Sequence, residues 1–117
     1  MATSEATARP SAPPPEILLA TTTVATRADA ERLAWLLVEQ RHAACVQLQA
    51  IEAVYHWDER VCQETEWRLL IKTSAERWPA ARQALLDAHP YELPALAVWA
   101  AASTPAFAGW VRDEVTP

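Results

Sequence analysis

The six residues from His89 to Pro94 read His-Pro-Tyr-Glu-Leu-Pro and bring an imidazole, a phenol and a carboxylate together with two prolines. Each proline fixes its own φ and disfavours helical backbone in the residue before it. We therefore predict that His89 ends a helix and that Leu93 is extended. A rigid corner with these three groups could bind a metal ion or a small ligand. Prolines are also common just past helix ends, so the alternative is a simple connector.

Composition narrows the class of protein. The chain has 117 residues, 51% of them hydrophobic, with a net charge of −5 and no run of basic residues. These values predict a globular domain and argue against a nucleic-acid partner. No apolar run is long enough to span a bilayer, and the first residues do not form a secretory signal, so we expect no membrane partner. We expect Cys45 and Cys62 to be reduced thiols of a cytoplasmic protein. The single glycine, Gly109, excludes glycine-rich phosphate loops.

The hydrophobic pattern predicts how the chain folds. Residues 1–15 are rich in Ala, Thr and Pro and predict a disordered tail, whereas residues 16–117 predict a single domain. The order of elements is β-α-β-β-α-β with an added C-terminal helix, an α+β arrangement of the ferredoxin-like type. The expected elements are a strand at 17–23, a helix capped by Thr26, two long strands around a turn at 58–60 with a β-bulge near Ala50, a helix ending at Ala88, a strand at 95–101 and a short helix from Pro105.

The two central strands are long for a domain of this size. A strand of about thirteen residues measures roughly 43 Å, whereas a compact domain of this length is roughly 35 Å across. The hairpin tip, with Tyr55, His56 and Trp57, should therefore extend beyond the core. An exposed aromatic arm favours aggregation unless another chain covers it, so we predict an oligomer. The alternative is a tip that folds back on its own helix.

Four motifs in this order resemble the CutA family of divalent-cation tolerance proteins. They are Arg-His-Ala-Ala-Cys-Val at 41–46, Tyr-x-Trp at 55–57, Leu-Ile-Lys-Thr at 70–73 and the His-Pro-Tyr-Glu-Leu-Pro corner. The resemblance covers residues 17 to about 115. It implies a homotrimer of ferredoxin-like subunits whose hairpins join strands across subunits. It also implies copper tolerance and binding of divalent metal ions, with no established chemical reaction.

Three positions depart from the family pattern. Glu59 stands where the family usually has a glycine at the hairpin turn, so we expect the turn to be reshaped. Ala95 replaces an acid that commonly follows the second proline of the corner. Thr22 aligns with a cysteine that some members have near the end of the first strand, which removes the softest candidate metal ligand.

The candidate site residues fall into two groups. For a metal ion such as Cu²⁺ or Zn²⁺, His89 is the leading ligand, and Cys45 follows because the family repeats Ala-Ala-Cys at this point. Each has a structural alternative. For His89 it is a histidine that the helix dipole favours at a helix C-terminus, and for Cys45 it is a small buried apolar side chain. For a small ligand, we expect a pocket at a subunit junction. Its predicted residues are Trp57, Lys72, Tyr91, Glu92 and Trp110.

Catalysis has little support in the sequence. There is no recognisable serine–histidine–acid grouping and no His-x-x-x-His spacing, so we predict that the protein is not an enzyme. Glu92 with His89 could exchange protons, but nothing indicates a substrate. Small trimers of ferredoxin-like subunits also resemble the PII signalling proteins. The alternative function is therefore a signalling module that binds a small ligand in its intersubunit clefts.

Overall fold

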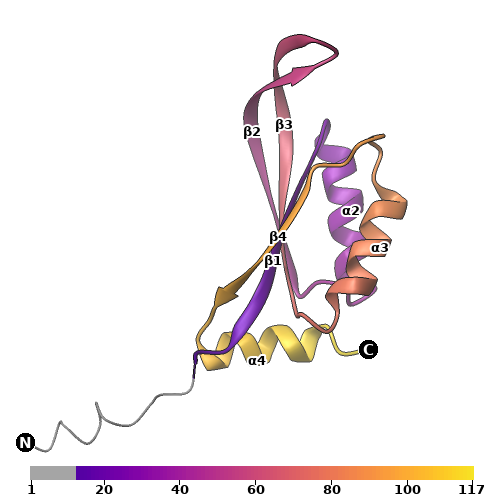
Figure 1. The fold of residues 1–117 in the computed structure, drawn as a ribbon. Coiled ribbons are helices and arrows are strands. Elements are labelled where there is room, and N and C mark those ends of the chain that lie inside the picture. Colours follow the sequence, from indigo (N-terminus) through magenta and orange to yellow (C-terminus); the bar gives the residue numbers. More distant parts are fainter. Residues whose placement is uncertain (1–12) are drawn as a thin grey trace, which may run out of the picture.

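The structure, a computed structural model, describes residues 13–117 and confirms the expected α+β, ferredoxin-like order of elements (Figure 1). The predicted disordered tail lies outside the described residues, apart from residues 13–15. Within residues 13–117, no helix is long and apolar enough to cross a membrane. The elements are β1 (Glu16–Val24), α2 (Arg27–Glu39), β2 (Cys45–Trp57), β3 (Arg60–Thr73), α3 (Trp78–Ala88), β4 (Leu96–Ala102) and α4 (Pro105–Glu114).

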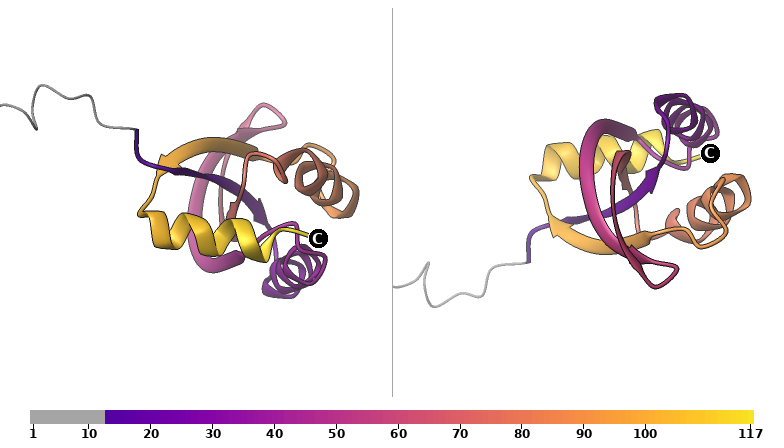
Figure 2. Two further views of the ribbon diagram at one scale, coloured as in Figure 1. Left: turned by 90° about the horizontal axis from the view of Figure 1, so that it is seen from below. Right: turned by 90° about the horizontal axis from the view of Figure 1, so that it is seen from above.

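The four strands form one antiparallel sheet in the order β2-β3-β1-β4. Side chains alternate along β1, so Ala20 and Val24 belong to the core under α2 and α3, whereas Ile17 and Leu19 pack with α4. Helices α2 and α3 lie side by side, and α4 crosses the opposite end of the sheet from the hairpin tip (Figure 1). The views along the molecule show how strongly the strands twist (Figure 2). Two helices thus cover one sheet face, and within the described residues 13–117 the other face is covered only where α4 lies.

Helix α2 is closed at both ends by local hydrogen bonds. Thr26 is its N-cap, as predicted, and its hydroxyl accepts a hydrogen bond from the Asp29 N–H at 3.1 Å. At the other end, the His42 N–H donates to the Leu37 carbonyl at 2.8 Å, and Arg41 takes a φ of 58°. This is a Schellman motif in which arginine stands where glycine is usual. The buried side of the helix is formed by Ala30, Leu33 and Leu37.

The hairpin turn differs from our expectation. Trp57 pairs directly with Arg60, so the turn has only two residues, and both have positive φ: 52° at Asp58 and 60° at Glu59. This is the conformation that glycine favours in two-residue hairpins. The turn is therefore not reshaped, and the prediction was wrong on this point. Glu59 adopts the left-handed backbone at a cost of about 1–2 kcal/mol, because its Cβ crowds the following carbonyl.

The predicted β-bulge near Ala50 was also wrong. Strands β2 and β3 pair in one unbroken register from Cys45 opposite Lys72 to Trp57 opposite Arg60. Along β2, the inward-facing side chains change from even-numbered to odd-numbered positions near Ala50, and this change has another cause. The last β1 partner of β3 lies directly across from Ala50, so beyond this point the hairpin has left the helices that define the buried side.

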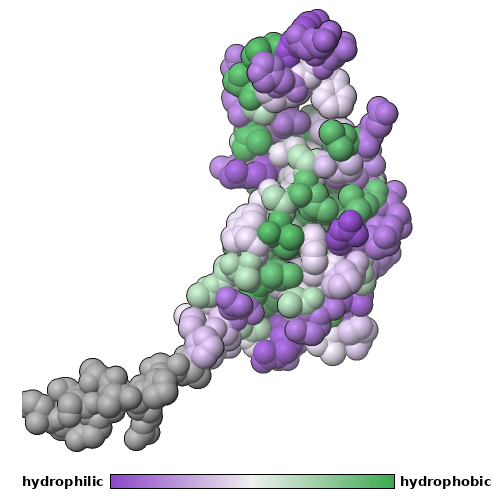
Figure 3. Space-filling view, in the orientation of Figure 1, coloured by the Kyte–Doolittle hydropathy of each residue, from purple (hydrophilic) through white to green (hydrophobic). Residues whose placement is uncertain are grey.

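Beyond this point the hairpin forms an arm, defined here as residues 51–66. Residues 60–66 of β3 pair only with β2, because pairing with β1 runs from Leu18 to Val24. The arm therefore extends past the core, as predicted (Figure 1). Apolar surface reaches solvent along it (Figure 3). Its most exposed apolar side chains are Val54 (68%), Trp57 (53%) and Val61 (67%).

Two hydrogen bonds of polar side chains lie at the edge of the core: a buried one between two side chains and a partly buried one to the backbone. The hydroxyl of Thr22 lies 2.9 Å from Nε2 of His89, and the hydroxyl of Thr73 donates to the His42 carbonyl at 2.7 Å. Thr22 is 1% exposed and His89 is 9% exposed. Burial lowers the pKa of His89 below its usual 6.5, and the nearby charge of Arg32 lowers it further. His89 is therefore neutral in the folded protein near pH 7.

We predict that replacing Glu59 with glycine stabilises the hairpin. Glu59→Gly removes the strain of a left-handed residue but gives the unfolded chain more freedom. The net gain should be about 0.5–1 kcal/mol in the free energy of unfolding. Thermal unfolding at matched protomer concentration measures it. Glu59→Ala keeps the Cβ and serves as control, and equal stability of the two variants would contradict the explanation.

We also predict that the protein loses stability as the pH falls below about 6.5. The unfolded chain protonates His89 in this range, whereas the folded chain resists because its pKa is lowered, so acid favours unfolding. His89→Gln should flatten the dependence of the unfolding free energy on pH, as measured by urea unfolding. His42, whose pKa burial also lowers, acts with the same sign, and His42→Gln is the matched comparison. An unchanged slope in His89→Gln would rule out His89 as the group responsible.

Candidate functional site

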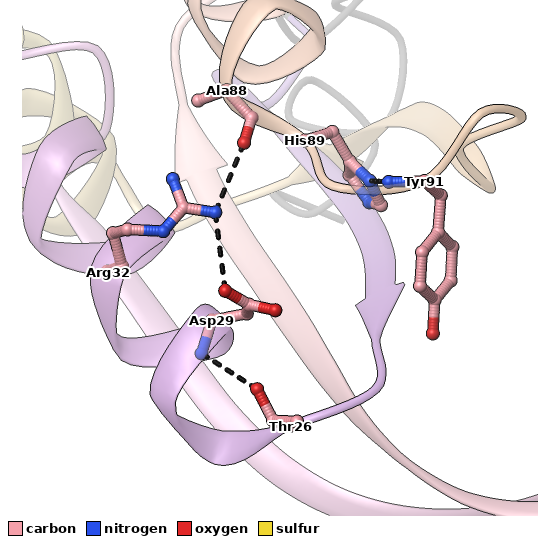
Figure 4. Close-up of polar contacts among 6 residues, drawn as sticks. All are labelled: Thr26, Asp29, Arg32, Ala88, His89 and Tyr91. Carbon is pink, nitrogen blue, oxygen red and sulfur yellow. Dashed lines mark hydrogen bonds and ion pairs between the residues drawn. The ribbon is translucent and has the colours of Figure 1, made fainter.

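The corner that begins at His89 is built around the imidazole ring. Helix α3 ends at Ala88, and His89 is its C-cap with extended backbone (φ −69°, ψ 134°), as predicted. Ring atom Nδ1 accepts a hydrogen bond from the Tyr91 N–H at 3.1 Å (Figure 4). Because the lone pair of Nδ1 is used in this way, the ring proton is on Nε2, which donates to the Thr22 hydroxyl. Both ring nitrogens are therefore occupied.

An arginine holds the helix ends beside this corner together. The Nη2 group of Arg32 donates to the Ala88 carbonyl at 3.2 Å and lies 3.4 Å from the Asp29 carboxylate (Figure 4). It satisfies a carbonyl in the last turn of α3, which has no partner within the helix. The contact joins the end of α3 to the first turn of α2. This contact therefore fixes the position of Ala88, the residue just before the corner.

One phenol connects the corner to the hairpin, and a second lies within the hairpin itself. The Tyr91 ring lies edge-on to His89 with centroids 5.1 Å apart, and its hydroxyl donates to Glu66 at 3.0 Å. Farther out, the Tyr55 hydroxyl donates to Glu64 at 2.8 Å. Burial and the Glu66 carboxylate both raise the pKa of Tyr91, and the hydrogen bond to Glu64 raises the pKa of Tyr55 to about 12. Both phenols therefore remain protonated donors at neutral pH.

Lys72 lies in a second aromatic cluster, on the face of the sheet that α4 covers. Its ammonium is 5.5 Å from the centroid of the Phe107 ring, a cation–π contact. Phe107 stacks on Trp110 with centroids 5.6 Å apart, and both rings are partly exposed. Trp57 lies elsewhere, at the end of β2. The residues predicted for one pocket thus occupy separate places in a single chain.

The distance between the corner and the Lys72 cluster can be estimated from the strand. Glu66, which binds Tyr91, and Lys72 are six residues apart on β3, which corresponds to roughly 20 Å. Glu92, next to Tyr91, is exposed. A pocket containing all the predicted residues therefore needs more than one subunit. It stays a prediction about the junction between subunits.

The predicted metal ligands do not come together either. Cys45 pairs with Lys72, whose face of the sheet carries α4, whereas His89 bonds to Thr22 on the face under α2 and α3. The imidazole has no free nitrogen for an ion. Among residues 13–117 there is no group of three or more His, Cys, Asp or Glu side chains placed to hold a metal. The residues of one described chain therefore do not fit a complete copper or zinc site.

Sequence reasoning missed two features. The first is the partner of His89: a buried threonine in an apolar strand is a signal for a buried polar contact, but its partner is 67 residues away. The second is a groove of about 280 Å³ on the open face of the sheet. The residues that line the groove are far apart in the sequence and meet only because they lie on adjacent strands. They are Thr21, Gln47, Gln49, Arg68, Leu70 and Trp99.

Comparison with known proteins agrees with this architecture. The sequence matches the family described as CutA1 divalent ion tolerance protein over residues 18–114. A divalent-cation tolerance protein CutA from Thermus thermophilus is 31% identical over 93 residues, covering 78% of this chain and 90% of that protein. A probable divalent-cation tolerance protein cutA homolog from Encephalitozoon cuniculi is 38% identical over 72 residues, covering 62% of this chain. The aligned part spans 63% of that protein, less than two thirds of its length.

Solved structures show the same fold. CutA from Synechococcus elongatus superimposes with a TM-score of 0.83 at 35% identity, covering 86% of this chain and 91% of that chain. A protein described as PII-like protein CutA from Nostoc, in apo form, has a TM-score of 0.80 at 33% identity and covers 85% of this chain and 97% of that chain. The family match runs from β1 to α4 and includes all four motifs that suggested the resemblance. The chain therefore belongs to the CutA1 family of divalent ion tolerance proteins.

Proposed function

We propose that this chain acts in divalent-cation tolerance as a cytoplasmic homotrimer whose binding sites are completed between subunits. The observation that carries the proposal is the arm. Its apolar side chains at Val54, Trp57 and Val61 are more than half exposed, and no third strand within residues 13–117 supports it. Burial of such surface against another subunit is strongly favourable, at about 25 cal/mol per Å².

The topology of the sheet supports a closed ring of subunits. Strands β2 and β4 form its two edges, and they run in opposite directions. The β2 edge of one subunit can therefore pair antiparallel with the β4 edge of the next, a head-to-tail contact that closes into a ring. We propose three subunits because the resemblance to the CutA family implies a homotrimer. The surface that remains for packing includes Trp99, Phe107 and Trp110, each 36–44% exposed.

Binding of copper or zinc ions by this trimer is the finer part of the proposal. An ion at His89 must displace the hydrogen bond of either Thr22 or Tyr91, because both ring nitrogens are occupied. Metal-ligating side chains from a neighbouring subunit would have to compensate for the lost hydrogen bond. We therefore expect modest affinity, and we assign no step of a reaction to a metal.

Two further parts of the proposal concern location and chemistry. Cys45 and Cys62 are free thiols, each partly buried, and two unpaired thiols suit a reducing compartment such as the cytoplasm. We also propose that the protein is not an enzyme. The side chains at the corner are committed to one another, with Tyr91 donating to Glu66 and His89 bonded at both nitrogens.

A second candidate function is a PII-like signalling module that binds a small ligand in its intersubunit clefts. The separation of the Tyr91 corner from the Lys72 cluster favours it, since subunit contact is what could bring such groups together. The similar Nostoc protein is described as PII-like. Ligand binding at the clefts that does not depend on metal would favour this candidate over ion binding.

The metal proposal predicts a defined response in calorimetry. Tag-free, metal-stripped protein titrated with Cu(II) and Zn(II) should bind at a whole-number ratio per trimer. Thr22→Cys places a thiol beside His89 and should tighten binding, since thiolate and imidazole are preferred ligands of these ions. Thr73→Cys, a buried thiol beside the His42 backbone, is the matched control.

Loss of binding in His89→Ala would place His89 among the ligands. Binding equal to that of the unmodified protein would place the ion elsewhere. If the unmodified protein gives no heat beyond that of buffer, metal binding must be abandoned, and the intersubunit cleft becomes the site to examine.

The trimer proposal predicts that the arm is needed for assembly. Trp57→Ala should lower the trimer fraction at a given concentration. The reason is that it removes an apolar side chain at the hairpin end that is about half exposed in the single subunit. Sedimentation velocity over a dilution series measures this, with circular dichroism to show that the subunit remains folded. Trp35→Ala removes an exposed indole from α2, away from the arm, and serves as control. An unchanged trimer in Trp57→Ala would show that the arm is not an interface.

A further inference from the structure

The groove of about 280 Å³ lies on the open face of the sheet, the face that α2 and α3 do not cover. Its residues come from all four strands and line up by register. Thr21 is opposite Leu70, which is opposite Gln47, and in the next row Arg68 is opposite Gln49. Because directly paired residues share a face, these side chains converge on one surface.

Among the described residues that line the groove, Arg68 is the only one with a charged side chain. Its Nη2 group donates to the Gln49 side-chain oxygen at 2.6 Å, which positions the guanidinium. The ion pairs found among residues 13–117 involve Arg27, Arg32 and Arg41, and none involves Arg68. The acid two residues before it, Glu66, accepts a hydrogen bond from Tyr91 instead. Arg68 thus has charge and N–H donors available for another partner.

We propose that this groove binds a small oxyanion, with a carboxylate or phosphate group held by Arg68. A guanidinium offers paired, coplanar N–H donors that match the two oxygens of either group. The carboxamide of Gln47 and the hydroxyl of Thr21 add donors beside it. The Trp99 ring, 44% exposed, provides a flat apolar wall for the rest of the ligand. An aromatic wall with few convergent polar groups is the usual form of a small-ligand site.

The inference rests on the proposed homotrimer for its physiological meaning. If the open face packs toward neighbouring subunits, each Arg68 loses water, and an unpaired buried charge is strongly unfavourable. Symmetry repeats the charge in each subunit, so several guanidinium groups would share one region. A bound anion offsets both effects. It should therefore stabilise the assembly as well as occupy the groove.

The test uses two probes, citrate and inorganic phosphate, titrated separately into the full-length protein at constant ionic strength. At least one should bind saturably, and added salt should weaken it. Arg68→Gln should lower the affinity about tenfold or more, the usual effect of losing a charge-assisted hydrogen bond. Arg68→Lys keeps the charge but not the paired donors and should bind more weakly than the unmodified protein. Arg82→Gln, on the exposed surface of α3, is the matched control.

Sedimentation of the same samples separates this inference from the proposed trimer. An intact trimer that binds neither anion overturns the anion site and leaves the trimer standing. A monomer that binds citrate or phosphate through Arg68 supports the anion site and contradicts the proposed trimer. Equal affinity in Arg68→Gln and the unmodified protein also overturns the site. Should Arg68→Gln fail to fold, Gln47→Leu removes a second donor, and unchanged anion affinity in that variant overturns the site.

Discussion

The hairpin of β2 and β3 is longer than the sheet to which it belongs, and most of the structure is arranged around this mismatch. Pairing between β3 and β1 stops at Trp67 opposite Val24, while β2 and β3 continue to their turn at residues 58–59. The core under α2 and α3 is therefore small, and a large share of apolar surface lies outside it. A two-stranded ribbon without a third strand is only marginally stable in water. The length of the hairpin thus links the stability of the fold to the contacts of its arm.

The corner at His89 solves a different problem, that of ending α3 and leading the chain into β4. The imidazole accepts a hydrogen bond from the Tyr91 N–H, two residues along the chain, and donates one to Thr22 in β1. Arg32 completes the same junction from α2. These contacts hold the start of the corner in place without requiring a ligand. They also mean that any ligand at His89 must compete with an interaction of the fold itself.

Much of this architecture was predictable because its signals are local. Period-2 and helical patterns, the Thr26 cap and the proline that follows α3 each act within a few residues. The errors came where distant elements decide the outcome. The parity change near Ala50 reflects the end of a third strand and not a bulge, and Glu59 keeps positive φ because the paired strands impose it. The opposite faces of Cys45 and His89 likewise follow from strand register, which no local pattern reveals.

The distribution of charge explains why the open face of the sheet matters for function. The exposed sides of α2 carry charged residues such as Arg27, Glu31 and Glu39, which suit contact with water. The groove on the open face instead presents Trp99, Leu70 and uncharged amides around the guanidinium of Arg68, while Lys72 lies farther along the same face against Phe107. A surface this apolar suits contact with protein, yet one Arg68 in each subunit is an obstacle to packing unless its charge is balanced. An oxyanion in the groove removes that obstacle. Ligand binding and assembly would then depend on the same residue, which is a direct physical route from a small molecule to the state of the oligomer.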